Sequence, residues 1–111
     1  MMNAVNRPEY RPKIELSFLE LATKWETTIM AQHKPSSRNS EQAHLRHFKA
    51  YFGNAPVSRI RNQSLQQWMA GSKLKPRSIR NFLATVKLVF KAGIAWGYLK
   101  ENPCNGVILP R

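Results

Sequence analysis

The sequence predicts an all-α domain, a small bundle of four to five helices. Apolar residues recur at helical spacing in four stretches, and no stretch shows sustained alternation of apolar and polar residues between hairpin turns. Proline and glycine also stand where helices would begin and end. A chain of 111 residues has room for one domain with one modest core.

Each expected helix has start or stop signals. Ser17 is followed three residues later by Glu20, which is the capping-box pattern, and Gly53 and Gly97 stand where a left-handed terminal residue is favoured. The helices are expected over residues 18–32, 37–52, 62–70 and 76–97. Their candidate caps and first-turn residues are Ser17, the pair Ser36 and Ser37, Asn62, and Pro76.

The fourth expected helix divides into two faces at about 100° per residue. Its apolar face carries Ile79, Phe82, Leu83, Val86, Val89 and Phe90, and its basic face carries Arg77, Arg80, Asn81, Lys87 and Lys91. The stretch LKPRSIRNFLATVKLVFKAG, residues 74–93, contains five Lys and Arg residues and no acid. One core is expected to contain Trp25, Leu45, Phe48, Trp68, Leu83, Val86 and Phe90.

The charge, the hydrophobic content and the single cysteine limit the functions that this chain can have. The chain has 18 Lys and Arg against 6 Asp and Glu, a net charge of +12, and 42% hydrophobic residues, so we expect a folded domain that binds a polyanion. No run of about 20 apolar residues could span a bilayer, and the first residues lack the apolar stretch of a signal peptide. We therefore expect a cytoplasmic location and no membrane partner. The single cysteine, Cys104, excludes an internal disulfide and is expected to be inert.

Two helix starts collect groups that bind phosphates. Ser36, Ser37, Arg38 and Asn39 stand at the start of the second helix, where free N–H groups and the helix dipole attract anions, and Ser78 repeats the arrangement in the fourth. On the basic face, Lys75 and Lys91 suit phosphates, whereas Arg77, Arg80 and Asn81 can also bond two base-edge atoms.

From about residue 17 to the end, the sequence resembles a known family. The stretches SFLELATKW, KPSSRNSEQAHLRHFKAYFG, PVSRIRNQSLQQWM and LKPRSIRNFLATVKLVFKAGIAWGYLKENP follow in the order of the N-terminal core-binding domain of tyrosine recombinases, the phage-integrase type. That domain is a SAM-like helical bundle. Residues 1–16 contain two prolines and no apolar period, which predicts a flexible arm. The resemblance implies a DNA-binding domain at 17–111, with a catalytic domain following residue 111.

The resemblance also implies a function and its residues. The domain would grip one side of a recombination half-site in double-stranded DNA, while the catalytic domain of the same polypeptide grips the other side. It would be a monomer alone and an oligomer on DNA as part of the full-length recombinase, and it would not be an enzyme by itself. The implied DNA-binding residues are Ser37, Arg38, Lys75, Arg77, Ser78, Arg80 and Asn81, with His44 and Lys87 further along the two helices. Lys91 joins them from the basic face.

Competing interpretations stay open on the sequence alone. The basic face could bind an acidic protein partner. The domain could instead bind RNA or single-stranded nucleic acid, but that function would require exposed aromatic side chains. Neither a cofactor nor a metal is expected, because His44 and His47 lack a third ligand nearby in the sequence. Trp25, Trp68, Trp96, Tyr51 and Tyr98 are all expected to pack against the core, Tyr51 and Tyr98 only partly buried.

Overall fold

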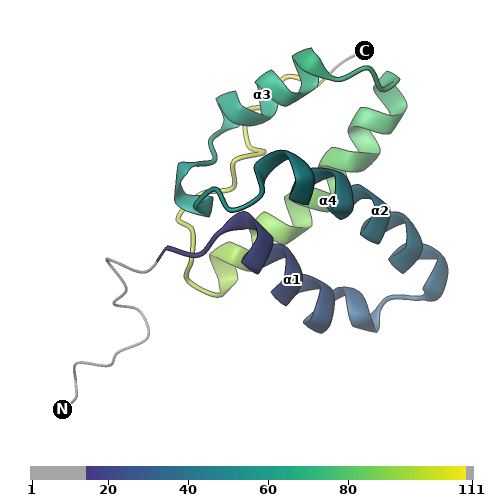
Figure 1. Cartoon of the computed structure of the whole chain (residues 1–111), viewed down its shortest axis with the longest axis vertical. Helices are drawn as coiled ribbons and strands as arrows, with labels where there is room; N and C mark the ends of the chain where they lie inside the picture. Colours follow the sequence, from purple (N-terminus) through teal and green to yellow (C-terminus); the bar gives the residue numbers. More distant parts are fainter. Residues whose placement is uncertain (1–14, 110–111) are drawn as a thin grey trace.

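The structure, a computed structural model, describes residues 15–109 (Figure 1). In this range the chain forms four α-helices and two short 3-10 turns with no β-strand, so the predicted helical bundle is confirmed. The elements are α1 (Phe18–Thr28), η1 (Met30–Gln32), α2 (Pro35–Phe52), η2 (Val57–Arg59), α3 (Asn62–Gly71) and α4 (Pro76–Ala95). No helix of the described range is both long and apolar enough to cross a lipid bilayer.

The start of α1 has the predicted capping box. The Ser17 hydroxyl accepts a hydrogen bond from the Glu20 amide at 3.1 Å, and the Glu20 carboxylate accepts one from the Ser17 amide at 3.0 Å. The helix is shorter than predicted, because the hydroxyls of Thr27 and Thr28 both donate to the Lys24 carbonyl and the chain tightens into η1.

The predicted caps of two other helices are wrong. In α2 the N-cap is Lys34, and Ser36 and Ser37 lie inside the first turn. Pro35 takes the first helical position because its fixed φ and missing N–H suit that place, and Pro76 does the same in α4, as predicted. In α3 the predicted cap Asn62 is the first helical residue instead. There the Ser64 hydroxyl accepts a hydrogen bond from the amide of residue 61.

The end of α4 follows the glycine signal. Gly97 has φ of 86°, its amide donates to the carbonyl of Ile94, and the amide of Tyr98 donates to the carbonyl of Gly93. This pair of bonds is the Schellman motif, which requires a left-handed residue after the helix. The last helical residue is therefore Ala95, two positions before the predicted end.

One core joins all four helices. The predicted members are all buried and belong to a single cluster, so this prediction is confirmed: Trp25, Leu45, Phe48, Trp68, Leu83, Val86 and Phe90. Aromatic rings form much of its centre. The ring centroid of Phe48 lies 4.7 Å from that of Trp68, and Phe18 on α1 lies 5.9 Å from Phe90 on α4. These contacts join α2 to α3 and α1 to α4.

The segments flanking the bundle are held to it by polar bonds. The carbonyl of Leu16 accepts a hydrogen bond from the amide of Val57, and the Glu15 carboxylate accepts one from the Ser58 hydroxyl, so the last two residues of the predicted arm are bonded to η2. The remaining predicted arm residues lie outside the described part. After α4, residues 104–109 run behind α3 (Figure 1), where the Gln66 side chain exchanges two hydrogen bonds with the backbone of Ile108, at 3.0 and 3.1 Å.

Gly93 allows α1 and the residues after α4 to approach the α4 backbone. A Cβ atom at position 93 would lie 3.0 Å from Leu99 Cδ1 and 3.1 Å from Leu21 Cδ2. We expect Gly93→Ala to destabilise the fold by about 1 kcal/mol, since an overpacking cost of about 1 to 3 kcal/mol exceeds the gain in helix propensity. Chemical denaturation measures the change. Gly71→Ala, where the new Cβ meets nothing within 4 Å, is the control and should be neutral or stabilising.

Candidate nucleic-acid interface

The outer face of α4 carries cations from Arg77 to Lys91. The side chains that the sequence placed on this face are all exposed: Arg77, Arg80, Asn81, Lys87 and Lys91. Lys75, the N-cap, is also exposed, and Ser78 is half-buried. On the inner face every predicted apolar residue is buried except Phe82, which is half-buried. The predicted division of this helix into two faces is therefore confirmed.

No carboxylate of the described range lies on α4 or α3. The sequence has no acid between Glu41 and Glu101. In that interval stand Arg46, Lys49, Arg59, Arg61, Lys73, Lys75, Arg77, Arg80, Lys87, Lys91 and Lys100. Glu20 caps α1, Glu26 pairs with Lys49 at 2.6 Å, and Glu41 bonds His33 at 2.8 Å. The acids of the helices therefore lie on α1 and α2, and the positive charge of α4 has no counter-charge within its own helix.

Two helices begin with a cation where the helix dipole is itself positive. Both α2 and α4 open with Lys and Pro, reach Ser at the third helical position, Ser37 and Ser78, and have no acid in the first turn. Acids normally stabilise this end of a helix, and lysine at the N-cap works against the dipole. An external anion would relieve that repulsion and accept the first-turn N–H groups, which have no partner within the helix.

The middle of α2 meets the middle of α4. Nδ1 of His44 lies 2.7 Å from the Thr85 hydroxyl, and its ring centroid lies 4.4 Å from that of Phe82. In Figure 1, α4 passes behind α2, and the two N-terminal ends lie apart. Among the predicted site residues, the structure therefore brings His44 to the edge of the α4 face. It leaves Ser37 and Arg38 at the far end of α2, a separate group.

Arg38 and Ser37 are half-buried at the start of α2. Nη1 of Arg38 donates to the backbone carbonyl of His33 at 3.2 Å, while the His33 ring bonds Glu41. One N–H of this guanidinium is thus committed within the fold. This hydrogen bond restrains the Arg38 side chain against the turn between η1 and α2, so the charge of Arg38 has a defined position.

The His44 contact should make stability depend on pH. Burial lowers the pKa of His44 below its usual value of 6.5, and Glu41 opposes this shift. The folded protein then binds this proton more weakly than the unfolded chain, so the free energy of unfolding should fall as the pH drops below about 6.5. Denaturation between pH 7.5 and 5.5 tests this, and His44→Gln should flatten the profile. An unchanged profile in His44→Gln would assign the pH dependence to another group.

A hollow of about 450 Å³ lies beside the basic face, between α4 and the C-terminal segment. Arg80, Ala84 and Lys87 of α4 line it opposite Cys104 and Val107 of the C-terminal segment. Burial raises the pKa of Cys104 to about 12, against the opposing effect of Lys87, so the thiol stays protonated at neutral pH and is a poor nucleophile. This agrees with the expectation of an inert cysteine.

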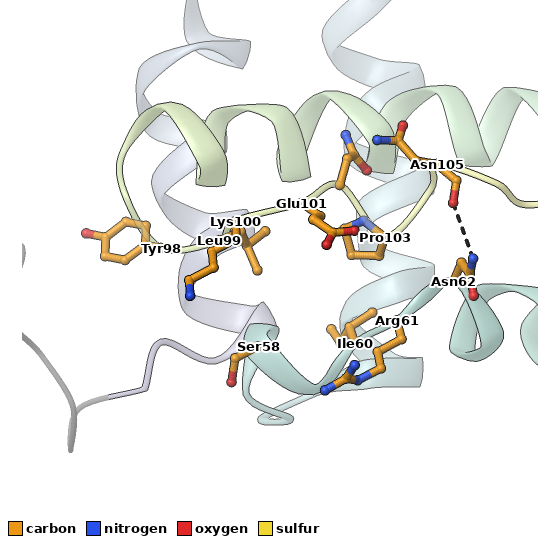
Figure 2. Close-up of a pocket in the computed structure, with 11 residues that line it drawn as sticks. Ser58, Ile60, Arg61, Asn62, Tyr98, Leu99, Lys100, Glu101, Pro103 and Asn105 are labelled. Carbon is orange, nitrogen blue, oxygen red and sulfur yellow. Dashed lines mark hydrogen bonds between the residues drawn. The ribbon is translucent and has the colours of Figure 1, made fainter.

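A second hollow of about 540 Å³ opens between the residues after α4 and the link from η2 to α3 (Figure 2). Figure 2 shows Glu101 pointing into the gap from one wall and Ile60 and Arg61 lying on the other, with the Asn62 to Asn105 hydrogen bond at one end. This hollow combines charges of both signs. The α4 face, by contrast, carries only positive charges.

The histidines do not form a metal site. Nε2 of His47 accepts a hydrogen bond from the Trp68 indole at 2.9 Å, and His44 is engaged with Thr85. Within residues 15–109, no group of three His, Cys, Asp or Glu side chains could hold a metal ion.

Three aromatic side chains expected to pack against the core are more exposed than the core residues. Trp96 is 38% exposed, so its predicted core packing is wrong, and Tyr51 and Tyr98, which were expected to be partly buried, are 52% and 39% exposed. Trp96 is the C-cap of α4 and Tyr98 follows Gly97, so both lie beyond the last helical residue, whereas the prediction placed Trp96 within the helix. Tyr51 is the last but one residue of α2, and its ring makes an edge contact with Phe52 at a centroid distance of 5.0 Å.

Sequence reasoning missed two apolar residues on the basic face. Ala84 and Leu88 are exposed between the cations of α4, and Leu88 is 43% exposed. The same 100° spacing that predicted the basic face places both of them on it.

Comparison with solved structures identifies a similar fold. The chain is similar to a solution NMR structure of a fragment, residues 61–160, of a protein from Clostridium leptum, with a TM-score of 0.76 and 22% sequence identity. The match covers 86% of this chain and 90% of that one. At this identity the similarity shows the fold alone. No protein-family model and no curated protein sequence matches the chain.

Proposed function

We propose that this chain is a duplex-DNA-binding module of a site-specific recombinase of the tyrosine, or phage-integrase, type. The observation that carries the proposal is the outer face of α4, where five exposed polar and cationic side chains stand without a carboxylate on the same helix. An exposed helix with this charge suits the major groove, which is wide enough for an α-helix and is walled by phosphates.

The other features of the site support the same function. The positively charged starts of α2 and α4 suit phosphates, and the His44 to Thr85 contact fixes how the two helices cross. The resemblance of the sequence to the core-binding domain supplies the recombinase context.

The module is proposed to bind DNA without cleaving it. In the resembled family, the second domain supplies the nucleophilic tyrosine and its basic helpers. Without that other half of the clamp, the module loses the gain in effective concentration that linkage provides. We expect dissociation constants in the micromolar range or weaker at physiological salt, by analogy with non-specific binding.

Fluorescence anisotropy with labelled 20-base-pair duplexes at 50 to 200 mM salt tests the proposal. Binding to several phosphates should make the logarithm of the association constant fall steeply with the logarithm of salt, by about 0.9 per phosphate. Failure to bind duplex DNA even at 50 mM salt would contradict the proposal and favour an acidic protein partner. Tight, sequence-selective binding by the isolated module would contradict the half-clamp arrangement.

A further inference from the structure

The central part of the α4 face alternates cationic and apolar side chains. Between residues 80 and 91 the exposed positions are Arg80, Asn81, Ala84, Lys87, Leu88 and Lys91. Leu88 lies on the outer face and is 43% exposed. Ala84 and Leu88 are one helical turn apart, so they form a small apolar patch bordered by charge.

The cations on both sides indicate what would cover this patch. Arg77 precedes the patch, Lys87 lies beside it and Lys91 follows it, so a partner whose phosphates contact these three cations also places its surface over Ala84 and Leu88. In a duplex, the surface between the two phosphate walls is the floor of the major groove. The apolar group on that floor is the 5-methyl group of thymine.

The spacing of the patch fits the base pairs. Side chains one turn apart on a helix have Cβ atoms about 5 to 6 Å apart, and successive bases in a strand are separated by about 3.4 Å along the axis. Ala84 and Leu88 would therefore meet bases one or two steps apart. The short side chain of Ala84 lets the helix approach closely, and Leu88 reaches further.

We propose that Leu88, with Ala84, binds the 5-methyl groups of pyrimidines in the major groove, so that the module prefers sites with thymine at these positions. The inference rests on the proposed DNA-binding function and extends it to specificity. Arg77, Arg80 and Asn81 can add polar base contacts, but the methyl preference depends on the apolar pair alone. The same chemistry makes 5-methylcytosine a ligand of this patch.

Two alternating A·T duplexes of 20 base pairs test the inference, one made with thymine and one with deoxyuridine. The two duplexes differ only by the methyl groups, and the protein can bind both at the same positions along the repeating sequence. The native protein should bind the thymine duplex about fourfold more tightly for each methyl group that Leu88 buries. Leu88→Ala should bring the ratio of the two affinities close to one while weakening binding to the uracil duplex little.

Two controls separate direct contact from other effects. Leu19→Ala removes a leucine of similar exposure, 38%, from α1 and should leave the ratio unchanged. An alternating G·C duplex should bind more tightly when its cytosines carry the 5-methyl group, and Leu88→Ala should lose this gain. Circular dichroism checks that Leu88→Ala keeps the fold.

The possible outcomes distinguish the two proposals. Salt-dependent binding with equal affinity for the thymine and uracil duplexes would overturn the methyl contact and leave the DNA-binding function standing. A thymine preference that persists in Leu88→Ala would assign it to DNA shape and also overturn the inference. No binding to any duplex at low salt would overturn both.

Discussion

Phe48→Ala should lower the free energy of unfolding by about 3 to 5 kcal/mol, the usual cost of truncating a buried phenylalanine. Phe48 is fully buried, and its ring lies within 4.7 to 6.2 Å of the rings of Trp68, His47, Phe52 and Phe82, measured between centroids. The substitution therefore removes contacts of α2 with both α3 and α4. Urea denaturation followed by circular dichroism measures the change.

The matched control is Tyr51→Ala, three residues further along α2. Tyr51 is 52% exposed, so its removal should change the free energy of unfolding by about 0.5 kcal/mol or less. A loss below about 1 kcal/mol for Phe48→Ala would mean that the inner faces of the helices are wrongly assigned.

Replacing Lys87 and Lys91 together by alanine should weaken duplex binding strongly. Both side chains are exposed on the outer face of α4. If each lysine neutralises one phosphate, the slope of the logarithm of the association constant against the logarithm of the salt concentration should become shallower by about two. At 0.1 M salt the affinity should then fall roughly fiftyfold. Stability should change little, because exposed substitutions away from special features are nearly neutral. Anisotropy titrations at several salt concentrations measure both quantities.

The control for this pair removes the same charge elsewhere. Lys24 on α1 and Lys100 after α4 are also exposed, and neither lies on the basic face. Lys24→Ala with Lys100→Ala should reduce affinity far less. Equal losses in the two double variants would show that net charge alone governs binding, and would contradict the assignment of the interface to α4.

Local signals in the sequence predicted the helices well. The Ser17 capping box and the first-turn Pro76 are present as expected, and the Gly97 turn ends α4 two residues earlier than predicted. The start of α2 was predicted less well, because Pro35 and the serines are both start signals. The fixed φ of proline decided the boundary, since it fits the first helical position without a hydroxyl cap.

The candidate interface was predictable only within each helix. A periodicity of 100° per residue is enough to place Arg77, Lys87 and Lys91 on one face. Periodicity carries no information on how two helices cross, so the contact of His44 with Thr85, 41 residues apart, could not be predicted. Trp96 was misplaced for a related reason, because helical spacing stops applying once the chain leaves the helix.

Four side-chain hydrogen bonds between residues far apart in the sequence affect the rate of folding. The pairs Glu15 and Ser58, His44 and Thr85, Asn62 and Asn105, and Gln66 and Ile108 are separated by 43, 41, 43 and 42 residues. Closing a loop of that length costs about 3 kcal/mol of chain entropy, so none of these four hydrogen bonds forms early by itself. Because the closed chain segments overlap, forming one bond lowers the entropy cost of forming the next. The four helices should therefore assemble in a concerted step that is slower than in a bundle whose contacts join only neighbouring helices.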